Sequence, residues 1–311
     1  MKTQVLVASG MLLVLAACGG EKQAGEAGTL SGTVSADGSS TVYPVTAAMA
    51  EEFGIETGGN VRVTVGQSGT GGGMRRFCAG EIDVVNASRP MKDTEKQACA
   101  ANGIEYIEMP VAFDGLSVVV NPQNTAVVCL TTAELKKLWE PGSKVNTWAE
   151  LRAGLPNERI KLYGPGTASG TFDYFTEAVV GKEDASRSDY TQSEDDNVLV
   201  QGVAGDRNSL GYFGFAYYVE NQDKLKLVQI DNGQGCIAPT PETIKSGQYA
   251  PLSRPLLIYV SHKALERPEV QGFLKFYNEH ADAIVPEVGY VPMNAADYEQ
   301  NISKLGTGTG A

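Results

Sequence analysis

Strand-like and helix-like segments alternate along almost the whole of this 311-residue chain. Short apolar runs predict strands, and apolar residues at helical spacing predict amphipathic helices between them. The predicted strands are Leu30–Ala36, Val61–Val65, Ile82–Asn86, Tyr106–Met109, Ser117–Asn121, Ile160–Tyr163, Lys226–Ile230 and Pro255–Val260. The predicted helices are Val42–Phe53, Gly72–Cys78, Thr94–Ala101, Thr132–Trp139, Thr171–Val180, Asn197–Val203, Pro241–Ser246, Pro268–His280 and Ala295–Lys304. This alternation favours an α/β fold whose sheets are mostly parallel or mixed.

The length and composition indicate two globular domains. Hydrophobic residues make up 42% of the chain and charged residues 20%, which is ordinary for a protein with a packed core. If Leu116–Val120 and Pro255–Val260 are crossover strands, the chain leaves one domain near residue 115 and returns near residue 254. We therefore expect domain I at residues 29–115 and 254–311, domain II at residues 116–253, and a ligand cleft between them. The alternative is that both segments are ordinary core strands of one sheet.

The first residues have the pattern of an export signal. Lys2 supplies a positive charge, and the apolar run Val5–Leu15 is too short to span a bilayer. The run leads into Ala16-Ala17-Cys18-Gly19, which resembles a bacterial lipobox. Residues 1–17 are thus predicted to be a lipoprotein signal peptide, Cys18 the lipidated residue, and residues 18–28 a flexible tether. We expect a protein of the cell envelope, lipid-anchored on the periplasmic or extracellular face, although an ordinary signal peptide cleaved near Ala17 is the alternative.

Four further cysteines remain for an oxidising compartment, and an even number predicts disulfides. They are Cys78, Cys99, Cys129 and Cys236, which allow three pairings. We favour Cys78–Cys99, local to one domain, and Cys129–Cys236 in the other. A metal site is the alternative, but no CxxC pair exists and both histidines lie far away in sequence, so neither a metal nor another cofactor is expected.

The charge of the chain bears on its partners. The sequence has 25 Lys+Arg against 37 Asp+Glu, a net charge of −12 with both His neutral. Nucleic-acid binding needs a basic face that replaces phosphate counterions, so this balance gives it no support.

Three segments share one design, in which a turn rich in Gly, Ser and Thr opens directly into a helix. They are Asp37–Pro44, Gly66–Gly73 and Gly164–Thr171. A helix N-terminus presents unpaired N–H groups and a partial positive charge, glycine lets an anion approach the backbone, and the hydroxyls add donors. A single turn of this kind is usually a plain N-cap. Three in one chain, on both sides of the first proposed crossover, are better explained by one shared anion.

Two charged residues could complete such a site. Arg89 follows a predicted strand and precedes Pro90, and an Arg in that place can grip two oxygens of one anion. Asp114 lies just before an apolar run at the proposed hinge, where it could pair with Arg89 or accept a hydrogen bond from a protonated oxyanion. The alternatives are a surface Arg in a loop and an ordinary turn residue before Gly115.

Motifs of common enzymes fit poorly. Gly66-Gln67-Ser68-Gly69-Thr70 lacks the last glycine of a nucleophile elbow, and Thr167–Thr171 lacks both glycines. Neither histidine is near a Gly/Ser-rich turn, so a Ser-His-Asp triad has no convincing base. Gly71 is followed by Gly72 instead of the Lys of a P-loop. We therefore expect no enzymatic activity.

Taken together, the motifs resemble the substrate-binding protein of the Pst-type phosphate ABC transporter. The resemblance rests on the lipobox and on Asp37–Pro44, Gln67–Gly73, Asn86–Pro90, Ser169–Thr171 and Leu210–Tyr218, in that order, and covers residues 29–305. It implies a two-domain, type II periplasmic-binding-protein fold that closes on phosphate like a hinge. It also implies that phosphate is held by Ser40 and Thr41 with the Val42 N–H, by Ser68, and by Ser169, Gly170 and Thr171. Permease subunits of the transporter are the implied protein partners.

The sequence departs from the best-known members of that family at two positions. Arg89 stands where they carry an Asp, and Pro165 stands where they carry an Arg. We expect Arg89 to supply the cation and Asp114 the carboxylate that favours hydrogen phosphate over fully deprotonated sulfate. The alternative functions are a phosphatase using the same site, a binder of another oxyanion such as sulfate or molybdate, and an adhesion or sensor protein.

Overall fold

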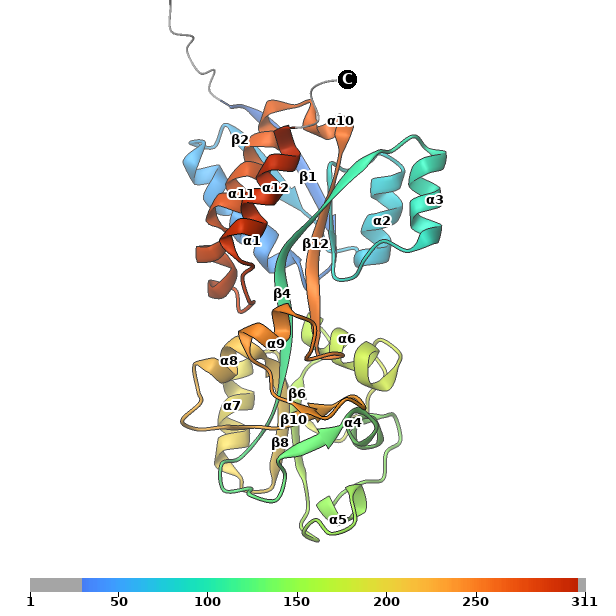
Figure 1. Ribbon diagram of the computed structural model, residues 1–311, viewed down its shortest axis with the longest axis vertical. Helices are drawn as coiled ribbons and strands as arrows, with labels where there is room; N and C mark the ends of the chain where they lie inside the picture. The colour runs from blue at the N-terminus through green and yellow to red at the C-terminus, as the bar shows by residue number, and fades with distance from the viewer. Residues whose placement is uncertain (1–29, 307–311) are drawn as a thin grey trace, which may run out of the picture.

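The computed structural model of this chain describes residues 30–306, which form two lobes joined by two long strands, β4 and β12 (Figure 1). The predicted signal peptide of residues 1–17, the lipidation site Cys18 and the tether of residues 18–28 lie outside the described residues. Within residues 30–306, no helix combines the length and the apolarity that crossing a bilayer requires.

The first lobe is built on a mixed sheet with strand order β2-β1-β3-β12-β4. Its parallel strands β1, β2 and β3 are each followed by a helix, and the last helices of the chain pack on the same lobe (Figure 1). The elements are β1 (Gly32–Gly38), α1 (Tyr43–Glu56), β2 (Val61–Val65), α2 (Thr70–Cys78), β3 (Val84–Ala87), α3 (Asp93–Ala101), α10 (His262–Leu265), α11 (Pro268–Glu287) and α12 (Ala295–Leu305).

The second lobe continues the sheet through β4 in the order β4-β8-β6-β7, with β9 also on β4, and adds a small sheet of order β11-β10-β5. Its strands are β5 (Cys129–Thr131), β6 (Lys161–Pro165), β7 (Thr191–Ser193), β8 (Ser209–Gly214), β9 (Lys226–Leu227), β10 (Gln229–Asp231) and β11 (Cys236–Ile237). Its helices are α4 (Thr132–Trp139), α5 (Trp148–Leu151), α6 (Gly170–Phe175), the π-helix η1 (Thr176–Val180), α7 (Asp196–Gly205), α8 (Phe215–Val219) and α9 (Pro241–Lys245).

The strands β4 (Tyr106–Val120) and β12 (Ser253–Ser261) run side by side between the lobes (Figure 1). The expectation of two separate strands, Tyr106–Met109 and Ser117–Asn121, is therefore wrong. Pro110 and Gly115 interrupt the apolar pattern, but antiparallel pairing with β12 continues past both. The pairing register shifts between Leu256 and Leu257, the latter opposite Pro110, which is where a residue without an N–H can be accommodated.

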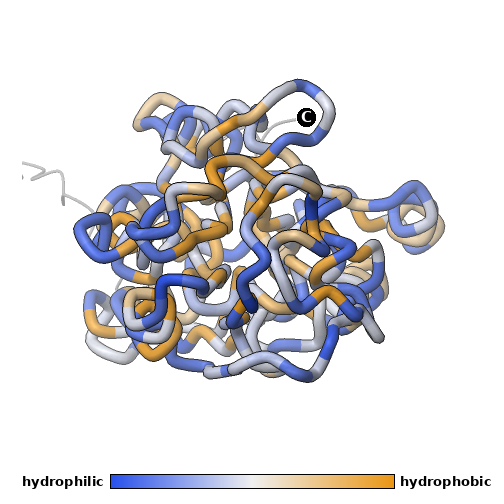
Figure 2. Tube along the Cα trace, turned by 90° about the horizontal axis from the view of Figure 1, so that it is seen from below, coloured by the Kyte–Doolittle hydropathy of each residue, from blue (hydrophilic) through white to orange (hydrophobic). Residues whose placement is uncertain are grey.

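The buried apolar residues divide in the same way as the lobes. One set draws on residues 34–112 and 256–305, and includes Phe53 with its ring centroid 5.6 Å from that of Phe273. Another draws on residues 116–252 together with Val291, and is centred on Trp139, whose ring meets the edges of Phe175 and Tyr212. Many outer turns are hydrophilic and hydrophobic segments run through the interior, as expected for packed cores (Figure 2).

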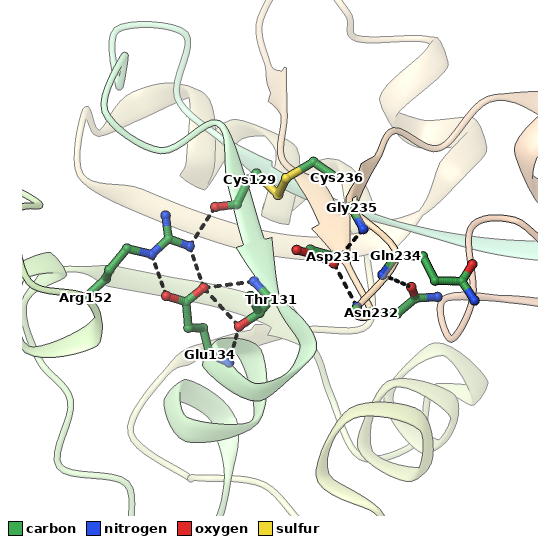
Figure 3. The surroundings of a disulfide bond; sticks show 10 residues. Cys129, Thr131, Glu134, Arg152, Asp231, Asn232, Gln234, Gly235 and Cys236 are labelled. Atoms are coloured by element: carbon green, nitrogen blue, oxygen red, sulfur yellow. Dashed lines mark hydrogen bonds and ion pairs between the residues drawn. A yellow bond between two sulfur atoms is a disulfide. The ribbon is translucent and has the colours of Figure 1, made fainter.

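Two disulfides join the cysteine pairs that the sequence analysis favours. Cys78–Cys99 links α2 to α3 inside a buried cluster of the first lobe. Cys129–Cys236 links β5 to β11 across 107 residues of sequence. Figure 3 shows that Arg152 bonds both the carbonyl oxygen of Cys129 and the carboxylate of Glu134, which itself caps α4. This disulfide therefore joins the two outer strands of the small sheet, and Arg152 with Glu134 links β5 to the start of α4.

We predict that replacing both Cys129 and Cys236 with Ala lowers the free energy of unfolding by about 2–5 kcal/mol, because the unfolded chain is freed from a long covalent loop. Urea unfolding of the oxidised wild type and the double variant measures the difference. Adding a reductant is the control, since it should lower the stability of the wild type more than that of the variant. An unchanged unfolding midpoint in the variant would contradict this account.

A candidate anion-binding cleft between the lobes

A cavity of about 450 Å³ lies where the two lobes meet β12. The first lobe contributes the ends of its parallel strands and the turns after them, because the carboxyl ends of β1, β2 and β3 meet at one edge of the sheet. The cavity is lined by Ser39, Ser40, Thr41, Ser68, Gly69, Thr70, Gly71, Gly72, Ser88, Arg89 and Lys92 of the first lobe, by Asp173, Tyr174, Glu177, Glu183 and Asp184 of the second, and by Arg254.

Two helices begin at this cavity without a side-chain cap. The N-cap of α1 is Val42 and that of α2 is Gly69, and neither side chain accepts a bond from the helix. By contrast, Thr131, Thr147 and Thr240 cap α4, α5 and α9 with their hydroxyls. The first-turn N–H groups of α2 are thus left for water or an anion next to a wall of the cavity. In α1 the N–H of Tyr43 donates to the carbonyl oxygen of Ser39 at 3.0 Å, and Pro44 has no N–H.

The turns after β1 and β2 are held together by Asp37, which is 2% exposed. Its Oδ1 accepts hydrogen bonds from the N–H of Gly38 at 2.7 Å and of Ser68 at 2.9 Å, and its Oδ2 pairs with Arg76. Burial alone would raise the pKa of Asp37, but these bonds, Ser68 foremost, hold it below its usual value. A Cβ on Gly66 would lie 2.7 Å from Asp37 Oδ1, so glycine is required beside this carboxylate.

The third Gly/Ser/Thr turn approaches the first from the opposite lobe. Ser169 caps α6 by accepting the N–H of Thr171 at 3.2 Å. A Cβ on Gly170 would lie 2.9 Å from Thr41 Oγ1, so the two turns are in close contact across the lobes. Ser169, Gly170 and Thr171 are not among the residues that line the cavity, and neither is Val42.

Arg254 is a central residue that the sequence analysis missed. Its Nε lies 3.2 Å from Asp114 Oδ2, and its Nη2 donates to Thr41 Oγ1 at 2.9 Å. Its guanidinium also lies 3.6 Å from the ring centroid of Tyr174, in a cation–π contact. The only hint in the sequence is that this Arg begins an apolar strand. Its partners are 140 and 213 residues away along the chain, beyond the reach of any local pattern.

Arg89 and Asp114 do not pair with each other, which was one of the two possibilities for Asp114. Arg89 makes a bidentate ion pair with Glu95 at the start of α3, with distances of 2.9 and 2.8 Å. Asp114 lies opposite Arg254 in the register of β4 and β12, is 2% exposed, and does not line the cavity. Burial raises the pKa of the Asp114 carboxyl, and the charge of Arg254 opposes that rise. Arg89 does line the cavity, so each residue keeps a place near the site but with a different partner.

The other charges near the cavity are mostly acidic on the side of the second lobe. Among residues 30–306, no group of three or more His, Cys, Asp and Glu side chains is arranged to hold a metal ion. His262 and His280 belong to α10 and α11 and take no part in the cavity wall. The arrangement therefore offers hydroxyls, the N–H groups of α2 and the guanidinium groups of Arg254 and Arg89, which together suit an oxyanion.

We predict that Asp37→Ala lowers the free energy of unfolding by about 1–3 kcal/mol at neutral pH, because two backbone N–H groups lose their acceptor. Since the folded-state pKa of Asp37 is lowered, its contribution is present above the ordinary carboxyl pKa of about 4 and is lost as the pH falls further. The gap between wild type and variant should accordingly narrow in acid. Urea unfolding of the wild type and of Asp37→Ala, at neutral pH and again below about pH 4, measures this difference in the free energy of unfolding.

Glu81→Ala is the matched control for this variant. Glu81 is the other carboxylate partner of Arg76, and both side chains of that pair are well exposed. Its removal should change the free energy of unfolding by no more than about 0.5 kcal/mol. Equal losses in both variants would show that the hydrogen bonds to Ser68 and Gly38 contribute little.

Comparison with known proteins agrees with this geometry. The sequence matches the family model of a PBP superfamily domain over residues 23–279. Protein SphX of Synechococcus elongatus is 49% identical over 276 residues, which cover 88% of this chain and 81% of the relative. The phosphate-binding protein PstS of Staphylococcus saprophyticus is 40% identical over 300 residues, which cover 96% of this chain and 92% of the relative.

A solved structure extends the likeness to the fold. The crystal structure of a possible phosphate-binding protein from Planctomyces limnophilus has a TM-score of 0.86 and 50% sequence identity, and the match covers 90% of this chain and 100% of that chain. The expected two-domain periplasmic-binding-protein architecture is thereby confirmed. The chain belongs to the PBP superfamily and, within it, to the Pst-type phosphate substrate-binding proteins.

Proposed function

We propose that this protein binds inorganic phosphate in the cleft and delivers it to the permease of an ABC transporter. The observation that carries the proposal is the combination at one cavity of Arg254, the hydroxyl-rich turn before α1 and the uncapped N-terminus of α2. Family membership supports phosphate as the oxyanion, since the PstS relatives are named for binding it. Binding and release require no covalent step, so we propose a carrier and not an enzyme.

The proposed ligands come from both lobes. The hydroxyls of Ser40, Thr41 and Ser68 and the N–H of Val42 donate from the first lobe. Ser169, Gly170 and Thr171 donate from the N-terminus of α6, which the contact of Gly170 with Thr41 already brings close. Arg254 supplies the principal positive charge. Arg89 adds a second positive charge at the cavity wall, which the carboxylate of Glu95 partly neutralises.

Asp114 acts in this proposal by positioning Arg254. A buried guanidinium needs a partner, because an isolated buried charge is strongly unfavourable. Asp114 satisfies the Nε, and the remaining N–H groups of the fork are then available to Thr41 and to the ligand. This role differs from that of a proton acceptor, which would need a place in the cavity wall.

Binding by closure follows from the two-lobed architecture. We propose that residues 29–115 with 254–311, and residues 116–253, move as units about the middle of β4 and β12. Closure brings the turn at Ser169 onto an anion already bound by the first lobe and removes it from water. The closed lobes together present the surface that the permease recognises. We further propose that the chain is exported by residues 1–17 and anchored to the membrane through lipid on Cys18.

We predict that Arg254→Gln weakens phosphate binding by about thirtyfold or more, because truncating a buried charged hydrogen-bond partner costs about 2–5 kcal/mol. Calorimetric titration of phosphate-stripped protein measures the affinity, and a thermal melt checks the fold. Arg89→Gln is the matched control and should weaken binding by less than about tenfold, because that guanidinium is already paired with Glu95.

The proposal fails if the wild type binds no phosphate, or if folded Arg254→Gln protein keeps wild-type affinity. A larger loss in Arg89→Gln than in Arg254→Gln would return the principal cation to Arg89. Measurable turnover of a phosphomonoester by the wild type would replace the carrier with a phosphatase.

A further inference from the structure

After the long helix α11, a tight turn directs the chain back to the junction of the two lobes. Gly289 has a φ of 89°, in the left-handed region that favours glycine. Its N–H donates to the carbonyl oxygen of Pro286 at 3.0 Å, and the N–H of Tyr290 donates to that of Val285 at 3.1 Å. These two bonds form a Schellman motif, which closes the C-terminus of α11 and fixes the direction in which Tyr290 leaves the helix.

The residue after Tyr290 joins this segment to the second lobe. Val291 and Phe113 of β4 exchange two backbone hydrogen bonds, of 2.9 and 2.8 Å, in an isolated antiparallel bridge. The side chain of Val291 is 7% exposed and packs in the buried cluster of the second lobe. A Cβ on Gly289 would lie 3.9 Å from the Cβ of Ala216 in α8, so the segment also lies against a helix of that lobe. Residues 289–291 therefore add a connection between the lobes to those made by β4 and β12.

The hydroxyl of Tyr290 reaches the first of the Gly/Ser/Thr turns. It donates a hydrogen bond of 2.8 Å to the carbonyl oxygen of Thr41, whose side-chain oxygen accepts from Arg254 at 2.9 Å. Thr41 lines the cavity, and it is thus held at its backbone by one partner and at its side chain by another. Burial raises the pKa of the Tyr290 hydroxyl, the charge of Asp114 raises it further, and the charge of Arg254 opposes the rise. The hydroxyl is therefore protonated at neutral pH and is a permanent donor there.

The carbonyl group of Thr41 and the N–H of Val42 belong to one peptide unit. A peptide unit is planar and trans, so its C=O and its N–H point in opposite directions. A hydrogen bond that fixes the carbonyl oxygen therefore also fixes the direction of the N–H. The same bond polarises the peptide unit, which makes its N–H a better donor.

We propose that Tyr290 is a positioning residue for the oxyanion site, which orients the Thr41–Val42 peptide unit toward the ligand. This inference deepens the proposed phosphate function and rests on it, because the Val42 N–H is one of the proposed donors. Tyr290 is not among the residues that line the cavity, so it acts through this peptide unit and not by touching phosphate. The turn at Gly289 and the bridge at Val291 hold it in place from both sides.

The first test is calorimetric titration of phosphate into phosphate-stripped Tyr290→Phe, which loses the hydroxyl and keeps the ring. We expect phosphate to bind about threefold to tenfold more weakly than it binds the wild type, because one hydrogen bond that orients a donor is lost. A thermal melt of each variant separates a loss of stability from a loss of affinity.

Tyr298→Phe is the matched control. Its hydroxyl also donates to a backbone carbonyl oxygen, that of Val111, at 2.9 Å, and neither residue lines the cavity. Its removal should leave the affinity for phosphate within about twofold of the wild type, even where the melting temperature falls.

The second test follows the amide proton of Val42 by NMR in protein labelled with 15N-valine. We expect phosphate to move this resonance downfield in the wild type and in Tyr298→Phe, because the N–H donates to the anion. The shift should be smaller in Tyr290→Phe, in which the peptide unit is no longer held. A change in stability alone would not alter this shift.

The inference is overturned, while the proposed function stands, if folded Tyr290→Phe binds phosphate as tightly as the wild type does. It is also overturned if Tyr298→Phe loses as much affinity, or if phosphate leaves the Val42 amide proton of the wild type unmoved. A wild type that binds no phosphate overturns both the inference and the proposed function.

Discussion

The ion pair between Arg254 and Asp114 lies where the two lobes meet, and the arrangement of the site depends on it. Both residues belong to the long strands that pass between the lobes, and they are partners in the register of those strands. Arg254 also contacts Thr41 in the first lobe and Tyr174 in the second. Burying two charges is costly unless each finds its partner, so the pairing register of β4 and β12, the placement of the cation and the meeting of the lobes are fixed together.

The cleft also contains backbone hydrogen-bond donors that have no partner in the protein. Gly69 stands at the N-cap of α2 and has no side chain to accept a bond from the first turn of that helix. Polar groups left open in this way carry a cost in the free protein. In a carrier, that cost is recovered when a ligand with several acceptor oxygens enters. Asp37 keeps the open turns in position meanwhile, since it bonds the backbone on both sides of the gap.

Local sequence patterns predict many helices and strands of this protein correctly, but they do not predict which charged side chains pair. The strand Val61–Val65 and the helix Thr132–Trp139 coincide with β2 and α4, because their periodicity and flanking residues act over a few positions. The long strand β4 was divided in two, since its continuity depends on β12, more than a hundred residues away along the chain.

Ser40, Thr41 and Ser68, which the resemblance to the family singles out, line one cavity because the turns after parallel strands meet at one edge of the sheet. Arg254 was missed, and the possible pair of Arg89 with Asp114 does not form, because the tertiary structure decides which carboxylate contacts which guanidinium. The spacing of residues along the sequence does not show which of these side chains come into contact.

Both ends of the described chain lie in the same lobe, since β1 opens the first lobe and α12 closes against it (Figure 1). In the proposed closure, a protein held by its N-terminus is held through the first lobe, so the lobe built from β5 to α9 is the one that moves. A reporter on that second lobe would follow the whole movement, whereas a tag at the C-terminus is attached to the first lobe and would record little of it.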